Sequence, residues 1–239
     1  MNTGFYKDLD TNYKIACKMS ECELNHDELL DLLQNGNIPE KQIAALRLDY
    51  VNTSEELSVL LNNLTGCDGK IREAVALKMY NFLANESQFR NLFFEKEMMS
   101  FVAILADATI DINANVCRLV VDSLSLIRGN SCFDKIYVEK VLNYIEEAYV
   151  DLDNIVFRDR KYTVNKILFK LYWCLEALKL YVNDVDRNSL SEILLRASEV
   201  SEYTIREKVA QILVNIDGFE ELKNKLKNDE NYYVRYVFK

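Results

Sequence analysis

Three residues near the N-terminus have the types and the spacing of metal ligands. Cys17, Cys22 and His26 form a C-x4-C-x3-H pattern. Zinc prefers thiolate and imidazole ligands, but a structural zinc site normally closes with four, and no fourth candidate follows nearby. Cys17 also falls on the apolar side of an expected helix. Packing is therefore the favoured interpretation, a metal site is the alternative, and no cofactor is expected.

His26 is the single histidine of the chain, which restricts catalysis sharply. A relay that activates a serine or cysteine nucleophile would have to use it. Because it directly follows Asn25 at the start of an expected helix, a solvent-exposed position is predicted instead. The segment from Gly66 to Lys70 has two residues between its glycines and lacks the Ser or Thr of a phosphate loop. A role other than catalysis is favoured, and an enzyme stays the open alternative.

Trp173 is the single tryptophan, and Tyr172 precedes it. It lies nine residues after Val164, off the apolar stripe of its expected helix. An aromatic side chain in this position would stack on a base or anchor a peptide. Burial against a neighbouring helix pair is the competing interpretation and the favoured one.

One marked cluster of basic residues precedes this tryptophan. Its members are Arg158, Arg160, Lys161, Lys166 and Lys170. Such a cluster suits contacts with phosphate groups, although positive charge at a helix N-terminus opposes the helix dipole. A solvated helix start is the simpler interpretation and is favoured.

The last nine residues read as a helix with two different faces. Val234, Val237 and Phe238 can face the preceding helices at helical spacing. The other side then carries Tyr232, Tyr233 and Tyr236. Exposed aromatic rings with polar hydroxyl tips suit a protein contact, so self-association or partner docking is predicted there. Tyrosines that fold back over the core are the alternative.

The apolar periodicity of the chain is helical throughout, which predicts an all-α fold. One Pro and six Gly in 239 residues are too few for the turns of a sandwich or barrel. Six segments carry an apolar stripe at helical spacing, starting at Ile43, Ile71, Val116, Val164, Ile205 and Val234. A partner helix is expected before each, at 29–33, 57–64, 98–105, 138–149, 190–197 and 219–226.

A single helix pair cannot bury its apolar stripe, whereas stacked pairs build a continuous core. The prediction is thus a superhelix (solenoid) of about six stacked helix pairs. It forms a single domain over 1–239, with a capping helix in 1–24 and repeats in 25–239. Helix starts are expected at three N-cap residues, each with Glu three positions on: Asn25, Thr53 and Ser189.

The second helices of these pairs resemble those of HEAT repeats. Ile71-Arg72, Ile205-Arg206 and Val234-Arg235 each place Arg after an aliphatic residue, and Ala or Val follows in the first two. The resemblance covers most of residues 25–239 and implies stacked helix pairs joined by a ladder of Arg–Asp contacts. It also implies a polar capping residue near Asp68 and Asn113. Ala44, Cys117 and Asn165 replace the Arg in three repeats, so no ladder contact is expected there.

The charge of the chain bears on its partners. The formal net charge is −9, and residues 1–66 hold five Lys or Arg against eleven Asp or Glu. Nucleic-acid binding depends on cations that displace phosphate counterions, so nucleic acid is disfavoured. The scattered cysteines indicate a reducing cytoplasm, and the N-terminus lacks the apolar core of a signal peptide. No membrane-spanning stretch is expected, because lysines and a glutamate interrupt 164–182.

These observations favour a cytoplasmic, non-catalytic scaffold or adaptor that binds a protein or peptide along the concave face of the superhelix. A sharper version is an inhibitor that neutralises a basic enzyme. The main rival is a DNA-repair glycosylase, since enzymes that remove alkylated purines resemble this fold; it would use Trp173 and the 158–170 cluster. A bilin lyase with short HEAT-like repeats is the third alternative, suggested only by the spacing.

Overall fold

Helices make up all the regular structure of residues 3–86, 88–155 and 161–239, which the computed structural model describes, with side chains from residue 11 on. The predicted all-α class is therefore confirmed. The chain divides into two compact units, Met1–Arg128 and Gly129–Lys239.

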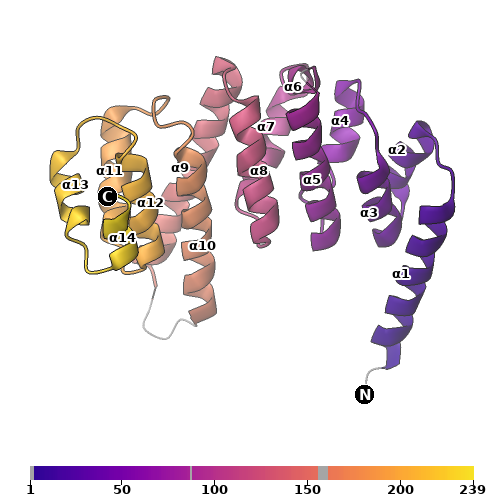
Figure 1. Cartoon of the computed structure of the whole chain (residues 1–239), viewed down its shortest axis with the longest axis horizontal. Helices are drawn as coiled ribbons and strands as arrows, with labels where there is room; N and C mark the ends of the chain where they lie inside the picture. Colours follow the sequence, from indigo (N-terminus) through magenta and orange to yellow (C-terminus); the bar gives the residue numbers. More distant parts are fainter. Residues whose placement is uncertain (1–2, 87, 156–160) are drawn as a thin grey trace. The chain divides into compact units, whose positions relative to one another are not determined.

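In unit 1 (Met1–Arg128) two rows of helices pack on each other (Figure 1). One row is α3, α5 and α8, in which each helix contacts the next; the other is α2, α4 and α7. The described helices of this unit are α1 (Thr3–Glu21), α2 (His26–Asn35), α3 (Ile38–Arg47), α4 (Ser54–Leu61), α5 (Gly69–Asn85), α6 (Phe89–Leu92), α7 (Met98–Thr109) and α8 (Ala114–Ile127). Helix α1 contacts α3, and Arg47 of α3 donates to the carbonyl oxygens of Met19 and Cys22 at 2.6 and 2.8 Å.

Unit 2 (Gly129–Lys239) repeats this arrangement with its own helices. Its row of second helices is α10, α12 and α14, in which α12 contacts both others. The described helices here are α9 (Ser131–Asp153), α10 (Lys161–Leu178), α11 (Arg187–Ser198), α12 (Tyr203–Leu213), α13 (Glu220–Lys227) and α14 (Tyr232–Tyr236). Tyr149 of α9 donates its hydroxyl to the carbonyl of Ile193 in α11 at 2.7 Å, which joins two first helices.

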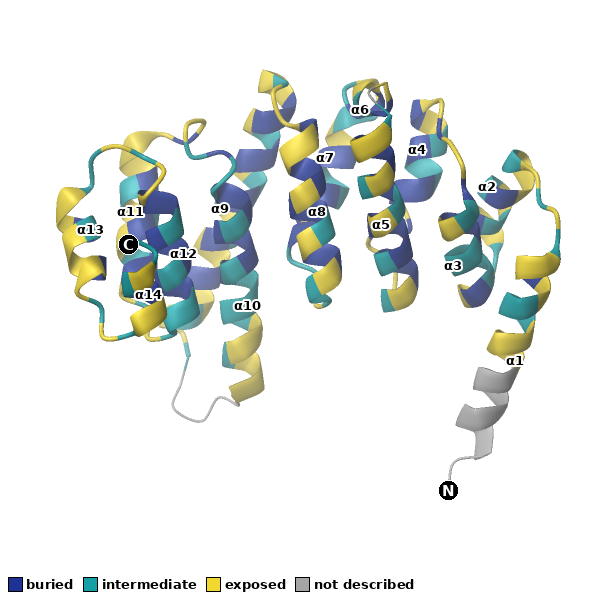
Figure 2. Cartoon of the chain, in the orientation of Figure 1, coloured by how far each residue is buried: buried dark blue, intermediate teal, exposed yellow. Residues whose placement is uncertain are grey.

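Most predicted apolar stripes face the interior, as the burial colours of the helices show (Figure 2). The whole stripe of α5 is buried. The stripe of α8 is buried except for the half-buried Leu119, and that of α12 is buried except for the half-buried Ile216, which follows the helix. The weaker stripe at Ile43 was wrong in part, because Leu46 and Tyr50 are exposed. Helix α3 instead packs through Pro39, Ala44, Ala45 and Leu48. The two small alanine side chains let neighbouring helices approach closely.

Side-chain caps start most helices. Asn25 and Glu28 form the predicted reciprocal capping box at α2, and Thr53 accepts from the Glu56 N–H at α4. The predicted start at Ser189 was wrong. Asp186 caps α11 instead, by accepting from the N–H groups of Asn188 and Ser189 at 3.0 Å each. Asp186, three residues upstream, competes better because a single carboxylate oxygen, Oδ2, accepts both backbone donors at once.

No helix in the described part of the chain combines the length and apolar character that crossing a bilayer requires.

Candidate interaction surface

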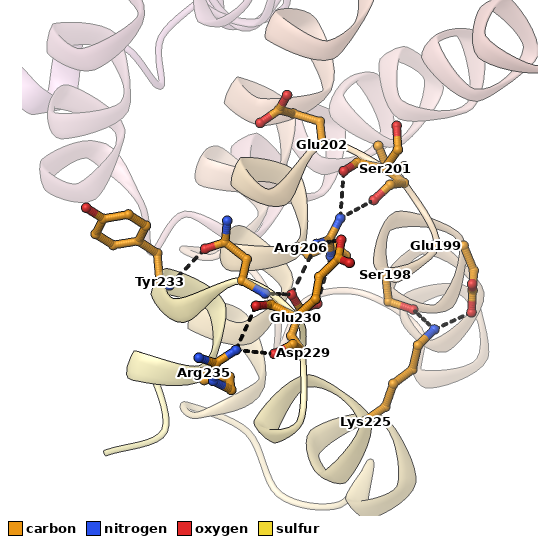
Figure 3. Close-up of polar contacts among 12 residues, drawn as sticks. Ser198, Glu199, Ser201, Glu202, Arg206, Lys225, Asp229, Glu230, Tyr233 and Arg235 are labelled. Carbon is orange, nitrogen blue, oxygen red and sulfur yellow. Dashed lines mark hydrogen bonds and ion pairs between the residues drawn. The ribbon is translucent and has the colours of Figure 1, made fainter.

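The turn between α13 and α14 is held by one buried arginine (Figure 3). Arg206 of α12 donates from Nε to Asp229 Oδ2 at 2.7 Å and from Nη2 to Asp229 Oδ1 at 3.1 Å. Its Nη1 donates to the carbonyl oxygens of Val200 and Ser201 at 2.9 and 2.7 Å. The guanidinium fork matches the carboxylate geometrically, so the two side chains fix the direction of the turn.

Asp229 also holds the start of α14 in place. Its Oδ1 accepts the Asn231 N–H at 2.7 Å, and Asn231 Oδ1 accepts the Tyr233 N–H at 2.9 Å. Arg235 of α14 donates from Nη1 to the carbonyl oxygens of Asp229 and Glu230 at 2.5 and 2.8 Å. A helix of five residues is not stable alone in water. These polar contacts therefore determine where α14 lies.

Charge makes these contacts stronger. The hydrogen bonds that Arg206 donates to Asp229 raise the pKa of Arg206, although burial alone would lower it. Burial would raise the pKa of Asp229, but the bonds from Arg206 and the Asn231 N–H outweigh it, and the pKa is lowered. Both groups therefore stay charged over the neutral range, at side-chain exposures of only 9% and 8%.

The face of α14 opposite this support is aromatic. Val234 is fully buried, whereas Tyr232, Tyr233 and Tyr236 are 50%, 58% and 57% exposed. We call these three residues the tyrosine surface. The Tyr232 ring lies 5.6 Å from that of Tyr233 and 5.5 Å from that of Tyr236, between centroids. Tyr203 of α12 stacks on Tyr233 at 6.0 Å. The rings therefore contact one another and form one continuous aromatic patch.

This arrangement suits binding to a protein. Each ring presents apolar area with few rotatable bonds, and each hydroxyl can donate or accept a hydrogen bond. The Lys239 ammonium lies 5.3 Å above the Tyr232 ring and 5.8 Å above that of Tyr236. It adds one positive charge at the edge of the surface.

Unit 1 contains the same support at a different helix pair. Arg72 of α5 donates to both oxygens of Asp111, at 2.5 and 3.1 Å, and to the carbonyl of Gly66 at 2.7 Å. Asp111 Oδ1 accepts the Asn113 N–H at 2.7 Å, and Asn113 caps α8. Sequence reasoning expected arginines here but did not identify either aspartate. The shared signal is Asp-x-Asn immediately before a second helix.

Trp173 and Tyr172 lie on α10, where neither side chain is exposed. Trp173 is 7% exposed, and its ring meets those of Tyr172 and Phe169 edge-on, at 5.3 and 6.2 Å between centroids. Tyr172 is half-buried beneath the Lys208 ammonium, which lies 4.6 Å from its centroid. Trp173 is covered although it lies off the apolar stripe, because α10 contacts both α9 and α12.

A polar network beside these rings joins α10 to α12. Glu176 forms ion pairs with the ammonium groups of Lys179 and Lys208, each at 2.5 Å. Burial opposes ionisation of Glu176, but the bonds from the two lysines outweigh it, and its pKa is lowered. Burial likewise opposes the charge on Lys208, whose pKa is nevertheless raised by Glu176. The carboxylate is therefore occupied by two cations.

The basic cluster is only partly described. Arg158 and Arg160 lie outside the described residues. Lys161 and Lys166 are exposed on α10, as a solvated helix start would be. Lys170 pairs with Glu147 of α9 at 2.7 Å and lies 5.0 Å above the Tyr144 ring.

The C-x4-C-x3-H residues do not come together as metal ligands. Within the described part of the chain, no group of three or more His, Cys, Asp or Glu side chains is placed to hold a metal ion. The prediction of an exposed His26 was wrong. Its ring stacks on Tyr50 at 4.0 Å between centroids, and Nε2 lies 3.3 Å from Glu56 Oε1. Stacking covers the imidazole because Tyr50 follows α3 into the loop beside α2.

Comparison with known proteins gives no functional assignment. No protein-family model matches the chain, and no curated protein matches its sequence. The chain is similar in structure to an engineered protein in a crystal structure from the Northeast Structural Genomics Consortium. The two share 15% sequence identity over 90% of this chain and 94% of the other, with a TM-score of 0.46.

Proposed function

We propose that this chain is a HEAT-like α-solenoid of about six stacked helix pairs that works as a non-catalytic scaffold for binding other proteins. Three features support the proposal. First and second helices alternate along each unit, and the second helices contact one another in a row. Arg72 and Arg206 bind aspartates in the turn before the second helix of the next pair, as the HEAT resemblance implies. The tyrosine surface is exposed, on a helix that Arg206, Asp229 and Arg235 hold in place.

The tyrosine surface is the observation that carries the binding role. Large apolar side chains that remain exposed on a soluble protein are typical of interaction sites, and tyrosine is among the residues that contribute most to binding. Here three of them share one short helix whose position is fixed by Arg206, Asp229 and Arg235. A surface ordered before binding loses less entropy when a partner arrives.

The rival role in DNA repair is less well supported. It needs an accessible aromatic side chain and a carboxylate near the scissile sugar, within a basic groove. Trp173 is buried, and the carboxylate beside it, Glu176, is bound by two lysines. We therefore propose a protein partner, in a reducing cytoplasm that suits the scattered cysteines of the chain.

Titration with a labelled DNA duplex of about 20 base pairs separates the two classes of partner. Near physiological salt we expect weak or undetectable binding, because the net charge of −9 repels phosphate. The triple variant Arg158→Ala, Arg160→Ala and Lys161→Ala should bind no differently. Submicromolar binding that weakens steeply with salt and is lost in this variant would establish the DNA-binding role instead.

A further inference from the structure

A groove lies between α11 and α13 of unit 2, on helices that do not carry the tyrosine surface. Its volume is about 490 Å³. The lining combines apolar side chains with carboxylates and consists of Ser191, Leu195, Glu199, Phe219, Glu220, Glu221, Leu222 and Lys225. An apolar floor with polar groups at its edge is the usual form of a binding site.

The apolar floor includes a leucine that the fold leaves uncovered. Leu195 is 51% exposed, whereas Leu190 and Leu194 of the same helix are 4% and 0% exposed. Covering such a side chain removes apolar area from water, which favours an occupant that brings an apolar group of its own.

Phe219 forms one end of the floor in an unusual backbone conformation. Its φ of 60° and ψ of 32° are left-handed, which is rare for a bulky residue. The Arg187 guanidinium lies 4.9 Å from the centroid of its ring and donates from Nη2 to the Asp217 carbonyl at 3.0 Å. A Cβ at Gly218, whose φ is +83°, would lie 2.2 Å from Arg187 Nη2. The backbone is therefore locally strained at the residue whose ring lines the groove.

The edge of the groove is negatively charged. Glu199, Glu220 and Glu221 contribute three carboxylates to the lining, against the ammonium of Lys225 and the Arg187 guanidinium over Phe219. That ammonium is already engaged, because it contacts Glu199 and lies 3.2 Å from Ser198 Oγ. Glu220 lies 3.6 Å from Lys223, and no ion pair joins Glu221 to a cation within the described residues.

We infer that this groove binds a basic amphipathic segment of a protein partner. An apolar side chain of the segment would contact Leu195 and Phe219, while its Lys or Arg side chains would face Glu220 and Glu221. A second copy of this chain is a poorer occupant, because it carries a net charge of −9. The inference rests on the proposed protein-binding role and names the chemistry of the partner.

The test uses a fluorescent helical peptide of about 14 residues, with Leu along one face and Lys elsewhere. We expect it to bind the wild-type chain in an anisotropy titration, more weakly at high salt. Leu195→Ser should weaken binding about tenfold, because it removes apolar contact in the groove. The double variant Glu220→Gln and Glu221→Gln should weaken it about fivefold.

The matched control is the double variant Glu95→Gln and Glu139→Gln, which removes the same charge at exposed positions elsewhere. It should bind the peptide as the wild type does. A scrambled peptide of equal composition, and one with Glu in place of Lys, should bind at least about tenfold more weakly.

Equal binding of the ordered and scrambled peptides by the wild type would overturn the inference, as would unchanged binding by both groove variants. It would also be overturned if light scattering showed dimers that the groove variants abolish, because the occupant would then be a second copy. The triple variant Tyr232→Ser, Tyr233→Ser and Tyr236→Ser, which removes the tyrosine surface, should still bind the peptide. If the wild type does not bind the peptide, the inference about the groove is wrong, whereas the proposed protein-binding role of the tyrosine surface is unaffected.

Discussion

Asp229→Ala is expected to lower the free energy of unfolding of unit 2 by about 3–5 kcal/mol. The substitution leaves the Arg206 guanidinium without its carboxylate at a side-chain exposure of 9%. It also removes the acceptor of the Asn231 N–H and so weakens the start of α14. An unpaired buried charge costs far more than the net contribution of the pair.

The double variant Arg206→Met and Asp229→Leu should recover part of this loss, because it leaves no charge unpaired. Recovery should be incomplete, since the carbonyl groups of Val200 and Ser201 lose a donor. Urea unfolding can be followed by the emission of Trp173, the single tryptophan, which lies buried in the same unit.

Glu230→Ala is the matched control in the same turn. Glu230 lies 3.4 Å from Arg206 Nη2, but its side chain is 87% exposed. Exposed ion pairs contribute little, so the change should stay within about 0.5 kcal/mol. Equal effects of Asp229→Ala and Glu230→Ala would show that the Arg206–Asp229 pair does not support the turn.

The stabilisation by Asp229 should depend on pH in one direction. Its pKa is lowered in the folded chain, so its contribution is present above the unfolded value of about 3.9 and is lost as the pH falls through the folded value. The difference in stability between wild type and Asp229→Ala should therefore be constant near neutrality and shrink below about pH 4.

Ile205→Asp should have an effect at least as large, about 4 kcal/mol or more. Ile205 is 0% exposed at the first turn of α12, the helix that α10, α11, α13 and α14 all contact. Aspartate there removes apolar contacts and places a carboxylate in the buried core.

Val214→Asp is the control for this change, because Val214 ends the same helix and is 46% exposed. A negative charge at a helix C-terminus opposes the dipole, so a loss of up to about 1 kcal/mol is expected. Urea midpoints for both variants decide the matter. A loss of only about 0.5 kcal/mol for Ile205→Asp would mean that Ile205 is not part of the core.

The sequence was sufficient to predict the helices wherever one strong apolar stripe decides burial. The stripe that starts at Ile71 falls inside α5, and the one that starts at Ile205 falls inside α12 except for Ile216; nearly every member is buried. The stripe at Ile43 failed, since Ile43 is only half-buried and Leu46 and Tyr50 are exposed; the small side chains of Ala44 and Ala45 are buried there instead. Periodicity of large residues cannot detect packing by small ones.

Contacts between distant residues could be predicted only in part. Arg72 and Arg206 were recognised from their positions after an aliphatic residue, but their partners lie 39 and 23 residues further on. That separation depends on loop lengths that no local pattern determines. Burial of Trp173 was favoured over exposure, and its cause, contact of α10 with helices on two sides, exists only in the folded unit.

The two candidate surfaces also differ in how far the sequence predicts them. The exposure of Tyr232, Tyr233 and Tyr236 follows from spacing around the buried Val234, and was predicted from it. The groove was not, because Leu195 and Phe219 come from helices that are separate in sequence. The left-handed backbone at Phe219 has no local signal beyond the preceding Gly218.

The protein-binding role is tested most directly by comparing what immobilised variants retain from an extract of the source cells. The wild type is compared with the triple variant Tyr232→Ser, Tyr233→Ser and Tyr236→Ser. The control triple variant, Val150→Ser, Tyr162→Ser and Val214→Ser, removes exposed apolar side chains elsewhere in unit 2. Circular dichroism checks that all three chains are equally helical, and light scattering detects a second copy as partner.

We expect the wild type and the control to retain the same proteins, or to self-associate equally, and the tyrosine variant to lose at least about nine-tenths of that binding. Equal retention and equal self-association by all three chains would contradict a protein-binding role for the tyrosine surface.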